Sequence, residues 1–250
     1  MPSLGSHLAS ARLLAGRLAH SGIDEDRGAF YLGATAPDIR VLTRLDREHT
    51  HFFTLDDFED QDSIARLFAE HPHLRDAVVL DATTRAFMAG YLTHLLMDQR
   101  YIERIYREFF GASSAYAQDP RGNVLDRLLQ YEMDRRERED VDAMTEIREA
   151  LAGTSAAADV GFIERATLQQ WREVACDIAG QPPTWDRFQR IASRHLPAAG
   201  IDTEEALEQF YRDLPDLLKE TIDHVTEERM REFIDLTVDD TTDRLREYLQ

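Results

Sequence analysis

Apolar residues recur along the chain at helical spacing. Between residues 4 and 18 they return every three or four positions, which is the period of one helix face. Ser3 stands just before this stripe and belongs to a residue type that caps helix N-termini. The pattern therefore predicts a first helix that starts after Ser3 and buries Leu4, Leu8, Ala11, Leu14, Ala15 and Leu18.

Similar periodicity continues through the rest of the chain, interrupted by turns that contain proline or glycine. We expect a second helix to begin at residues 24–26 and to end before Pro37, and a central helix to run from about Asp81 to Phe110. No alternating run of apolar and polar residues indicates a strand. The predicted fold class is all-α, with further helices at 57–70, 124–151, 159–179, 184–195, 203–218 and 220–249.

The best internal boundary is the run of small residues at 153–158. We expect residues 1–153 to form a helical core and residues 154–250 to form an additional helical region packed on that core. A chain of 250 residues is long enough to bury a core of this size.

The composition excludes several classes of function. The formal charge of −19 opposes binding to nucleic acid or to an anionic bilayer, because both carry negative charge. Cys176 is the only cysteine, so the sequence holds neither a disulfide framework nor a cysteine-based zinc site. No basic-then-apolar leader and no apolar run of spanning length are present. We expect a cytoplasmic protein without stable membrane insertion; the sequence indicates no oligomeric state.

The central helix carries two polar residues in an otherwise apolar run, His94 and Asp98. Their spacing of four places both on one helix face. Gly90 lies one turn earlier and leaves that face open to another backbone or to a ligand. A buried imidazole and carboxylate need partners, so they form either an isolated polar pair or part of a metal site.

Other histidines and acids stand in similar settings. His7 falls within the apolar stripe of the first helix, where it is either a hydrogen-bonded core histidine or a ligand. Asp38 follows Pro37 and is either a turn cap or a ligand. Of His49 and His51, we favour His51 as the ligand, because the two phenylalanines that follow it tie its neighbourhood to the core.

Glu132 lies close to the apolar stripe of the helix expected at 124–151. Glu132 is either a structural acid or an additional ligand, and His49 is also a possible additional ligand. Nitrogen and carboxylate ligands with one open position suit a divalent metal ion in a catalytic role. The candidate ligands that remain are His7, Asp38, His51, His94 and Asp98.

Four short segments occur in an order that resembles the zinc-dependent phospholipase C family, whose all-helical fold is shared with P1-type nucleases. The resemblance covers about residues 1–135. The segment at 90–98, with its glycine, histidine and aspartate, is the most specific of the four. The segments are His7, YLGATAPDI at 31–39, HTHF at 49–52 and GYLTHLLMD at 90–98.

The resemblance implies a helical scaffold that holds up to three zinc ions and a metal-activated water that cleaves phosphate esters. It implies that Asp98 bridges two ions and that Asp38 lies near the water. The chain departs from the family pattern, because residues 99–107 contain no histidine and the later His-x-x-x-Glu pair is replaced by Glu132 and Asp134. We therefore expect one or two ions, zinc or another divalent metal. The ligands implied by matching positions are His7, Asp38, His51, His94 and Asp98.

These observations predict a metal-dependent hydrolase of a phosphate ester, with Asp38 as the catalytic carboxylate. The negative charge ranks a small soluble phosphoester above a lipid as the substrate. Two alternatives stay open on the sequence: a metalloenzyme of non-hydrolytic chemistry that acts on a small metabolite, and a non-catalytic helical interaction module.

Overall fold

The computed structural model describes residues 1–54, 61–192 and 194–250, and the regular structure in these ranges is entirely helical. The all-α prediction is confirmed. The α-helices are α1 (Leu4–Leu18), α2 (Ser21–Asp24), α3 (Arg27–Gly33), α4 (Arg40–Thr43), α5 (Glu48–His51), α6 (Ser63–Glu70), α7 (Ala82–Tyr101), α8 (Arg121–Glu137), α9 (Val141–Gly153), α10 (Arg165–Ala179), α11 (Phe188–Ala192), α12 (Glu204–Val225) and α13 (Glu227–Tyr248). Shorter 3-10 segments are η1 (Ala36–Ile39), η2 (Pro72–Leu74), η3 (Ala77–Val79) and η5 (Pro197–Ala199), and a π-helix, η4 (Ile102–Phe110), continues α7.

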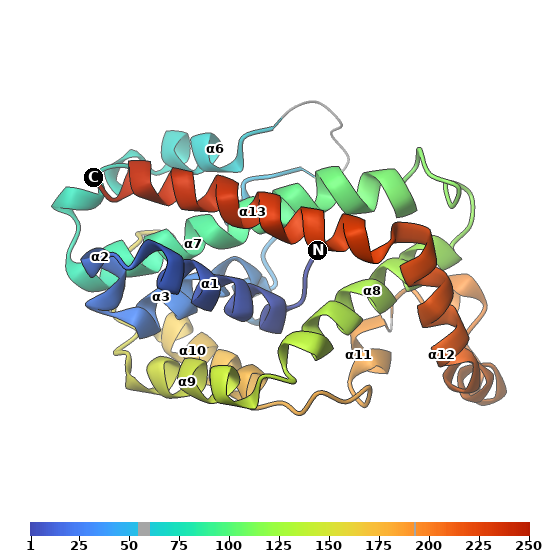
Figure 1. Cartoon of the computed structure of the whole chain (residues 1–250). Helices are drawn as coiled ribbons and strands as arrows, with labels where there is room; N and C mark the ends of the chain where they lie inside the picture. Colours follow the sequence, from blue (N-terminus) through green and yellow to red (C-terminus); the bar gives the residue numbers. More distant parts are fainter. Residues whose placement is uncertain (55–60, 193) are drawn as a thin grey trace.

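Helix α7 lies at the centre of the molecule, with α3, α6, α13 and α1 packed around it (Figure 1). It begins after Asp81, whose carboxylate accepts a hydrogen bond from the Thr84 amide. Its side chains are buried almost continuously from Ala86 to Gln99. A helix that is buried on every side provides a dry interior for any polar group it carries.

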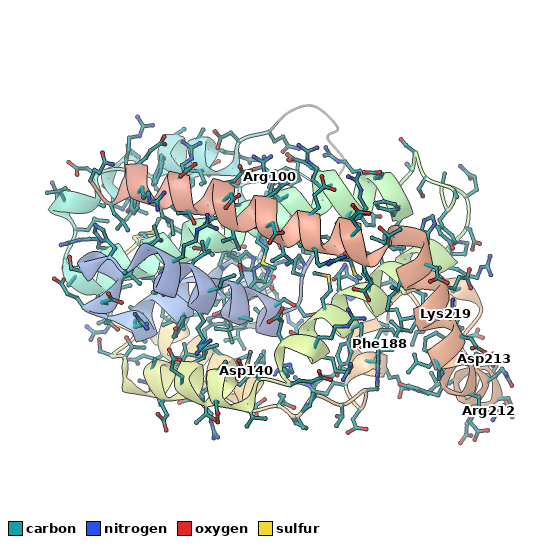
Figure 2. All side chains as sticks on the ribbon, viewed as in Figure 1. Arg100, Asp140, Phe188, Arg212, Asp213 and Lys219 are labelled. Carbon is teal, nitrogen blue, oxygen red and sulfur yellow. The ribbon has the colours of Figure 1, made fainter. Side chains whose placement is uncertain are left out.

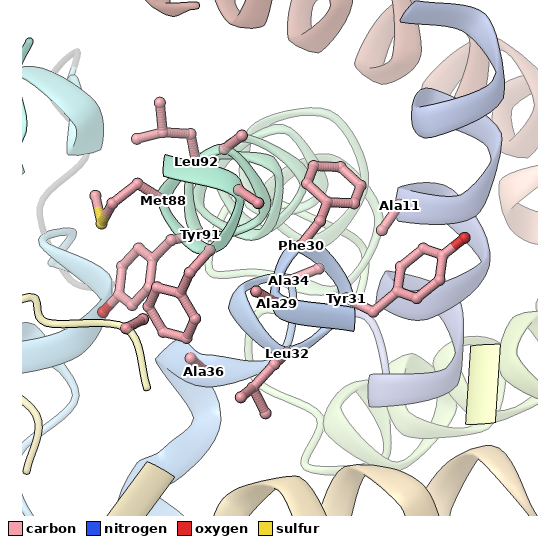
Figure 3. Close-up of a cluster of buried hydrophobic side chains, with 14 of the residues drawn as sticks. Ala11, Ala29, Phe30, Tyr31, Leu32, Ala34, Ala36, Met88, Tyr91 and Leu92 are labelled. Atoms are coloured by element: carbon pink, nitrogen blue, oxygen red, sulfur yellow. The ribbon is translucent and has the colours of Figure 1, made fainter. Parts of the chain in front are cut away.

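Two glycines bring α3 and α7 into backbone contact. A Cβ atom at Gly90 would lie 1.9 Å from the carbonyl oxygen of Phe30, and one at Gly33 would lie 1.9 Å from that of Phe87. The open face at Gly90 is therefore occupied by the backbone of α3 and not by a ligand. Figure 3 shows Tyr31 of α3 pointing away from this contact and toward Ala11 of α1.

The main hydrophobic cluster contains residues from both sides of the boundary expected at 153/154. Trp171 of α10 and Leu245 of α13 belong to the same cluster as the α3–α7 contact. The Trp171 indole nitrogen donates to the hydroxyl of Thr35 at 3.0 Å, just before η1. Tyr248, at the end of α13, donates to the Leu74 carbonyl at 2.9 Å. The later helices thus support the segments that precede α7.

Two expected helix boundaries differ from the structure. The single helix expected at 124–151 is wrong: α8 and α9 are separate, because the Asp140 side chain accepts from the Ala143 amide and starts a new helix. The helix end expected at residue 218 is also wrong, since α12 continues to Val225 and the chain turns at Thr226, whose φ is 73°. Of the helix expected at 57–70, residues 57–60 lie outside the described residues.

Charged side chains cover the outside of the molecule. Figure 2 shows Arg212, Asp213 and Lys219 of α12 at the far end from α1 and α7, where they extend into solvent. Arg100, near the middle of Figure 2, is paired with Asp240 of α13 at 2.7 Å. No helix within the described ranges is long and apolar enough to cross a membrane.

Candidate metal centre

Five histidine and aspartate side chains from four elements meet beside α7. Their ligand atoms form two groups of three in which every atom lies within 4.8 Å of the others. Both groups can hold a metal ion, and both include His94. The first group is His7, His94 and Asp98, and the second is Asp38, His51 and His94.

Helices α7 and α1 supply the first group. His94 and Asp98 are one turn apart on α7, and His94 Nε2 lies 3.6 Å from Asp98 Oδ2. The His7 ring of α1 stacks on the His94 ring, with centroids 3.7 Å apart and planes at 9°. The start of α1 is anchored by the Ser6 amide, which donates to the buried carboxylate of Asp134 at 3.1 Å. This anchor fixes His7 against α7.

The segment from η1 to α5 supplies Asp38 and His51, which join His94 of α7 in the second group. Asp38 lies in η1 directly after Pro37, and His51 ends the short helix α5. His51 Nε2 lies 3.4 Å from Asp38 Oδ1 and 3.4 Å from Asp98 Oδ2. The hydroxyl of Tyr91 on α7 donates to the Thr50 carbonyl and so holds α5 against the central helix.

Hydrogen bonds outside the centre orient two of the imidazoles. His94 Nδ1 lies 2.9 Å from the Ala34 carbonyl oxygen. Since a carbonyl only accepts, Nδ1 carries the proton and Nε2 presents its lone pair to the centre. The Thr50 hydroxyl donates to the Arg47 carbonyl at 3.3 Å and lies 3.1 Å from His51 Nδ1, which assigns the same tautomer to His51. Metal-ligating histidines are commonly held in this way.

Several polar atoms of the centre are buried without a hydrogen-bond partner. In the described part of the chain these include the Nε2 atoms of His7, His51 and His94 and the Oδ1 atom of Asp98. An unsatisfied buried polar atom costs about 1–3 kcal/mol, so four in one place require an explanation. Three imidazole nitrogens beside carboxylate oxygens are a donor set that suits a divalent transition metal. The side chains therefore fit a metal ion.

The surroundings shift the protonation of the ligands in different directions. Burial lowers the pKa of His7, whereas the pKa of His94 is raised, because the neighbouring Asp98 outweighs the effect of burial. Burial lowers the pKa of His51 to about 4, so this imidazole is neutral at pH 7. Burial alone would raise the pKa of Asp98, but the neighbouring His94 and His7 lower it well below its ordinary value. The pKa of Asp38 is likewise lowered, because the neighbouring His51 and His94 outweigh the effect of burial. Both carboxylates are ionised at pH 7.

Arg47 belongs to the centre, although it was not among the residues predicted from the sequence. Its Nη2 atom donates to Asp98 Oδ2 at 2.9 Å, and its Nη1 atom donates to the Phe53 carbonyl at 3.0 Å. Arg47 precedes His51 by four residues, the same spacing as that of His94 and Asp98. This spacing was the signal available, but it becomes informative only once residues 48–51 are known to be helical.

The centre opens to solvent on one side. The side chains of His7, His51 and Asp98 are at most 4% exposed, whereas Asp38 is 23% exposed and Arg47 is 11% exposed. A molecule that approaches from solvent therefore meets Asp38 and Arg47 first.

The two secondary candidates lie apart from the groups. His49 is exposed on α5, on a different side of the helix from His51. Glu132 of α8 accepts hydrogen bonds from Arg135 at 2.7 Å and from Arg136 at 2.8 Å. These ion pairs satisfy the Glu132 carboxylate and match its interpretation as a structural acid. Neither residue belongs to a potential metal-binding group among the described residues.

Comparisons of the chain with protein-family models, curated proteins and solved structures find no match. The structure shows an all-helical protein in which buried histidines and aspartates form groups that can hold a metal ion.

Proposed function

We propose that the chain is a zinc-dependent hydrolase of phosphate esters. The observation that carries the proposal is the set of unpartnered Nε2 atoms on His7, His51 and His94, which face the ionised carboxylate of Asp98. A purely structural cluster would leave these atoms unsatisfied in a dry interior. A divalent cation bound in either group of three would satisfy the atoms of that group.

His7, His94 and Asp98 would hold an ion on the buried side of the centre, or Asp38, His51 and His94 would hold one on the side where Asp38 is exposed. When bound, a zinc ion lowers the pKa of a coordinated water toward about 7 and so supplies a nucleophile near neutral pH. Asp38 is the carboxylate that reaches solvent, and it is the candidate to orient that water and accept its proton. Arg47, beside it, is placed to attract an anionic substrate.

The choice of phosphate esters rests on the resemblance of residues 1–135 to zinc-dependent phospholipase C enzymes. The segment from Gly90 to Asp98 and the segment that contains Asp38 support it most strongly. The charge of −19 favours a small soluble phosphoester over a lipid in an anionic bilayer.

The experiment is a turnover assay on protein purified without a histidine tag and loaded with zinc. The substrates are phosphomonoesters, phosphodiesters and phospholipids, each assayed with zinc and after chelation. We expect zinc-dependent hydrolysis of at least one class, and we expect Asp98→Asn to remove it. Zinc-loaded protein that hydrolyses none of them would overturn the proposal.

A metalloenzyme of non-hydrolytic chemistry is the second candidate. Catalytic zinc in hydrolases keeps one coordination position open for water. A metal ion whose coordination positions were all filled by these side chains would favour the second candidate. Stoichiometric metal together with turnover of a compound that contains no phosphate would identify this candidate. Retained partner binding with no role for the metal would instead identify an interaction module.

A further inference from the structure

The Asp98 carboxylate already has a cationic partner in the centre. Arg47 Nη2 lies 2.9 Å from Asp98 Oδ2, and the Arg47 side chain is only 11% exposed. The guanidinium is fixed in place, because it also donates to the Phe53 carbonyl. Since arginine is not deprotonated in proteins, this positive charge is permanent.

His94 limits how many ions can be held with full ligand sets. Both potential metal groups include His94, but its Nδ1 atom is committed to the Ala34 carbonyl. Only the Nε2 lone pair remains, and one lone pair coordinates one ion. His94 can therefore complete one of the two groups at a time.

Charge sets the same limit. With neutral imidazoles, the carboxylates of Asp38 and Asp98 and the guanidinium of Arg47 give a formal charge of −1. One divalent ion changes this to +1, which attracts a phosphate. A second would raise it to +3 among side chains that are almost fully buried. Coulomb repulsion is strong in such surroundings, because water does not screen it.

We propose that Arg47 takes the place of a second metal ion. The centre binds one divalent ion, and the Arg47 guanidinium provides the second positive charge for a phosphoryl oxygen; this rests on the proposed function. Arg47 and Asp38 are the most exposed side chains of the centre, and the Arg47 Nε and Nη2 atoms also contact Met1 Sδ, at 3.0 Å and 2.6 Å. A phosphoester that displaces the Met1 side chain meets the guanidinium. Arginine suits this role because its planar donors match the oxygens of a phosphate.

The test measures bound zinc and phosphate affinity in the same proteins. Zinc per chain is determined by elemental analysis after dialysis, and inorganic phosphate is titrated into the zinc-loaded protein by calorimetry. The variants are Arg47→Met, which removes the charge, and Arg47→Lys, which keeps it. Arg66→Met is the matched control, because Arg66 lies on the surface of α6 and pairs with Glu70.

We expect one zinc in the wild type, in Arg47→Lys and in Arg66→Met. Arg47→Met is expected to bind a second zinc. When only one zinc is bound, the phosphate affinity of this variant should be about tenfold or more below that of the wild type. If Arg47→Met does not fold, as judged by circular dichroism, Arg47→Gln replaces it, since glutamine is also uncharged and can still donate to the Phe53 carbonyl.

Two zinc ions in the wild type would overturn this inference alone. Unchanged zinc content together with unchanged phosphate affinity in the uncharged variant would also overturn this inference alone. Wild-type protein that binds no zinc would overturn both the inference and the proposed function. One zinc and the expected loss of phosphate affinity, with no turnover of any phosphoester, would support the role of Arg47 and count against the hydrolase.

Discussion

His94 Nδ1 donates a hydrogen bond of 2.9 Å to the carbonyl oxygen of Ala34, which lies 60 residues earlier in the chain. This bond joins the central helix to the segment that ends α3 and leads into η1. It fixes the orientation of the imidazole and turns its second nitrogen toward Asp98. The packing of α3 on α7 and the geometry of the metal centre therefore depend on each other.

Metal binding should stabilise the fold. A ligand that binds only the folded state at a thousand times its Kd adds about 4 kcal/mol to the free energy of unfolding. We expect zinc to raise the melting temperature of the wild type and to have no effect on Asp98→Asn. Asp126→Asn is the control, because Asp126 is also a buried carboxylate but accepts from Tyr101 and Gln130 outside the centre. A zinc-induced rise that persists in Asp98→Asn would contradict the ligand assignment.

The Thr50 hydroxyl should affect metal affinity without touching the ion. It is the partner of His51 Nδ1, and removal of such a partner weakens metal binding about 10- to 100-fold. We expect Thr50→Val to weaken zinc binding by this factor in a competition titration with a chelator. Thr145→Val on the exposed face of α9 should leave the affinity unchanged. Equal affinities in the two variants would show that Thr50 does not orient His51.

The contact between α3 and α7 should not tolerate a methyl group. In Gly90→Ala the new Cβ would collide with the Phe30 carbonyl, and overpacking of this kind costs about 1–3 kcal/mol or more. Gly16→Ala is the matched control, because a Cβ at Gly16 on α1 meets no atom within 4 Å. That substitution should be neutral or stabilising by up to about 1 kcal/mol. Urea denaturation measures both, and similar stabilities would contradict the close approach of the two helices.

Tyr31 should make the fold sensitive to alkaline pH. Burial raises the pKa of Tyr31 from 10.0 to about 12. The unfolded chain therefore loses this proton first as the pH rises. The stability contributed by neutral Tyr31 is fully present below pH 10 and is lost between pH 10 and pH 12. Denaturation at several pH values should show a smaller loss over this interval in Tyr31→Phe. An equal loss in both proteins would contradict the prediction.

All five candidate ligands were predicted from the sequence, but helical spacing indicated burial only for the three on the long helices α1 and α7. His94 and Asp98 interrupt an apolar run, and His7 falls within an apolar stripe, so their burial could be read from spacing alone. Arg47 could not be identified in the same way. It precedes a helix of one turn, α5, which is too short to show any periodicity.

The fold class could be predicted from the spacing of apolar residues, but some helix boundaries could not. Asp140 starts α9 within a charged stretch that contains neither glycine nor proline, so the break between α8 and α9 left no strong signal. A helix end was expected at residue 218, yet α12 continues to Val225 and includes Pro215 on its exposed side. The capping side chain of Asp140 decided the first boundary, whereas the exposed environment of Pro215 allowed the second helix to continue.

The central claim is that His7, Asp38, His51, His94 and Asp98 hold a divalent metal ion. The most direct test is a crystal structure of the zinc-loaded protein with anomalous diffraction measured on both sides of the zinc absorption edge. The claim predicts a strong anomalous peak between the Nε2 atoms of the three histidines and the carboxylate of Asp98. A zinc peak found only elsewhere, or no peak in this position, would contradict it.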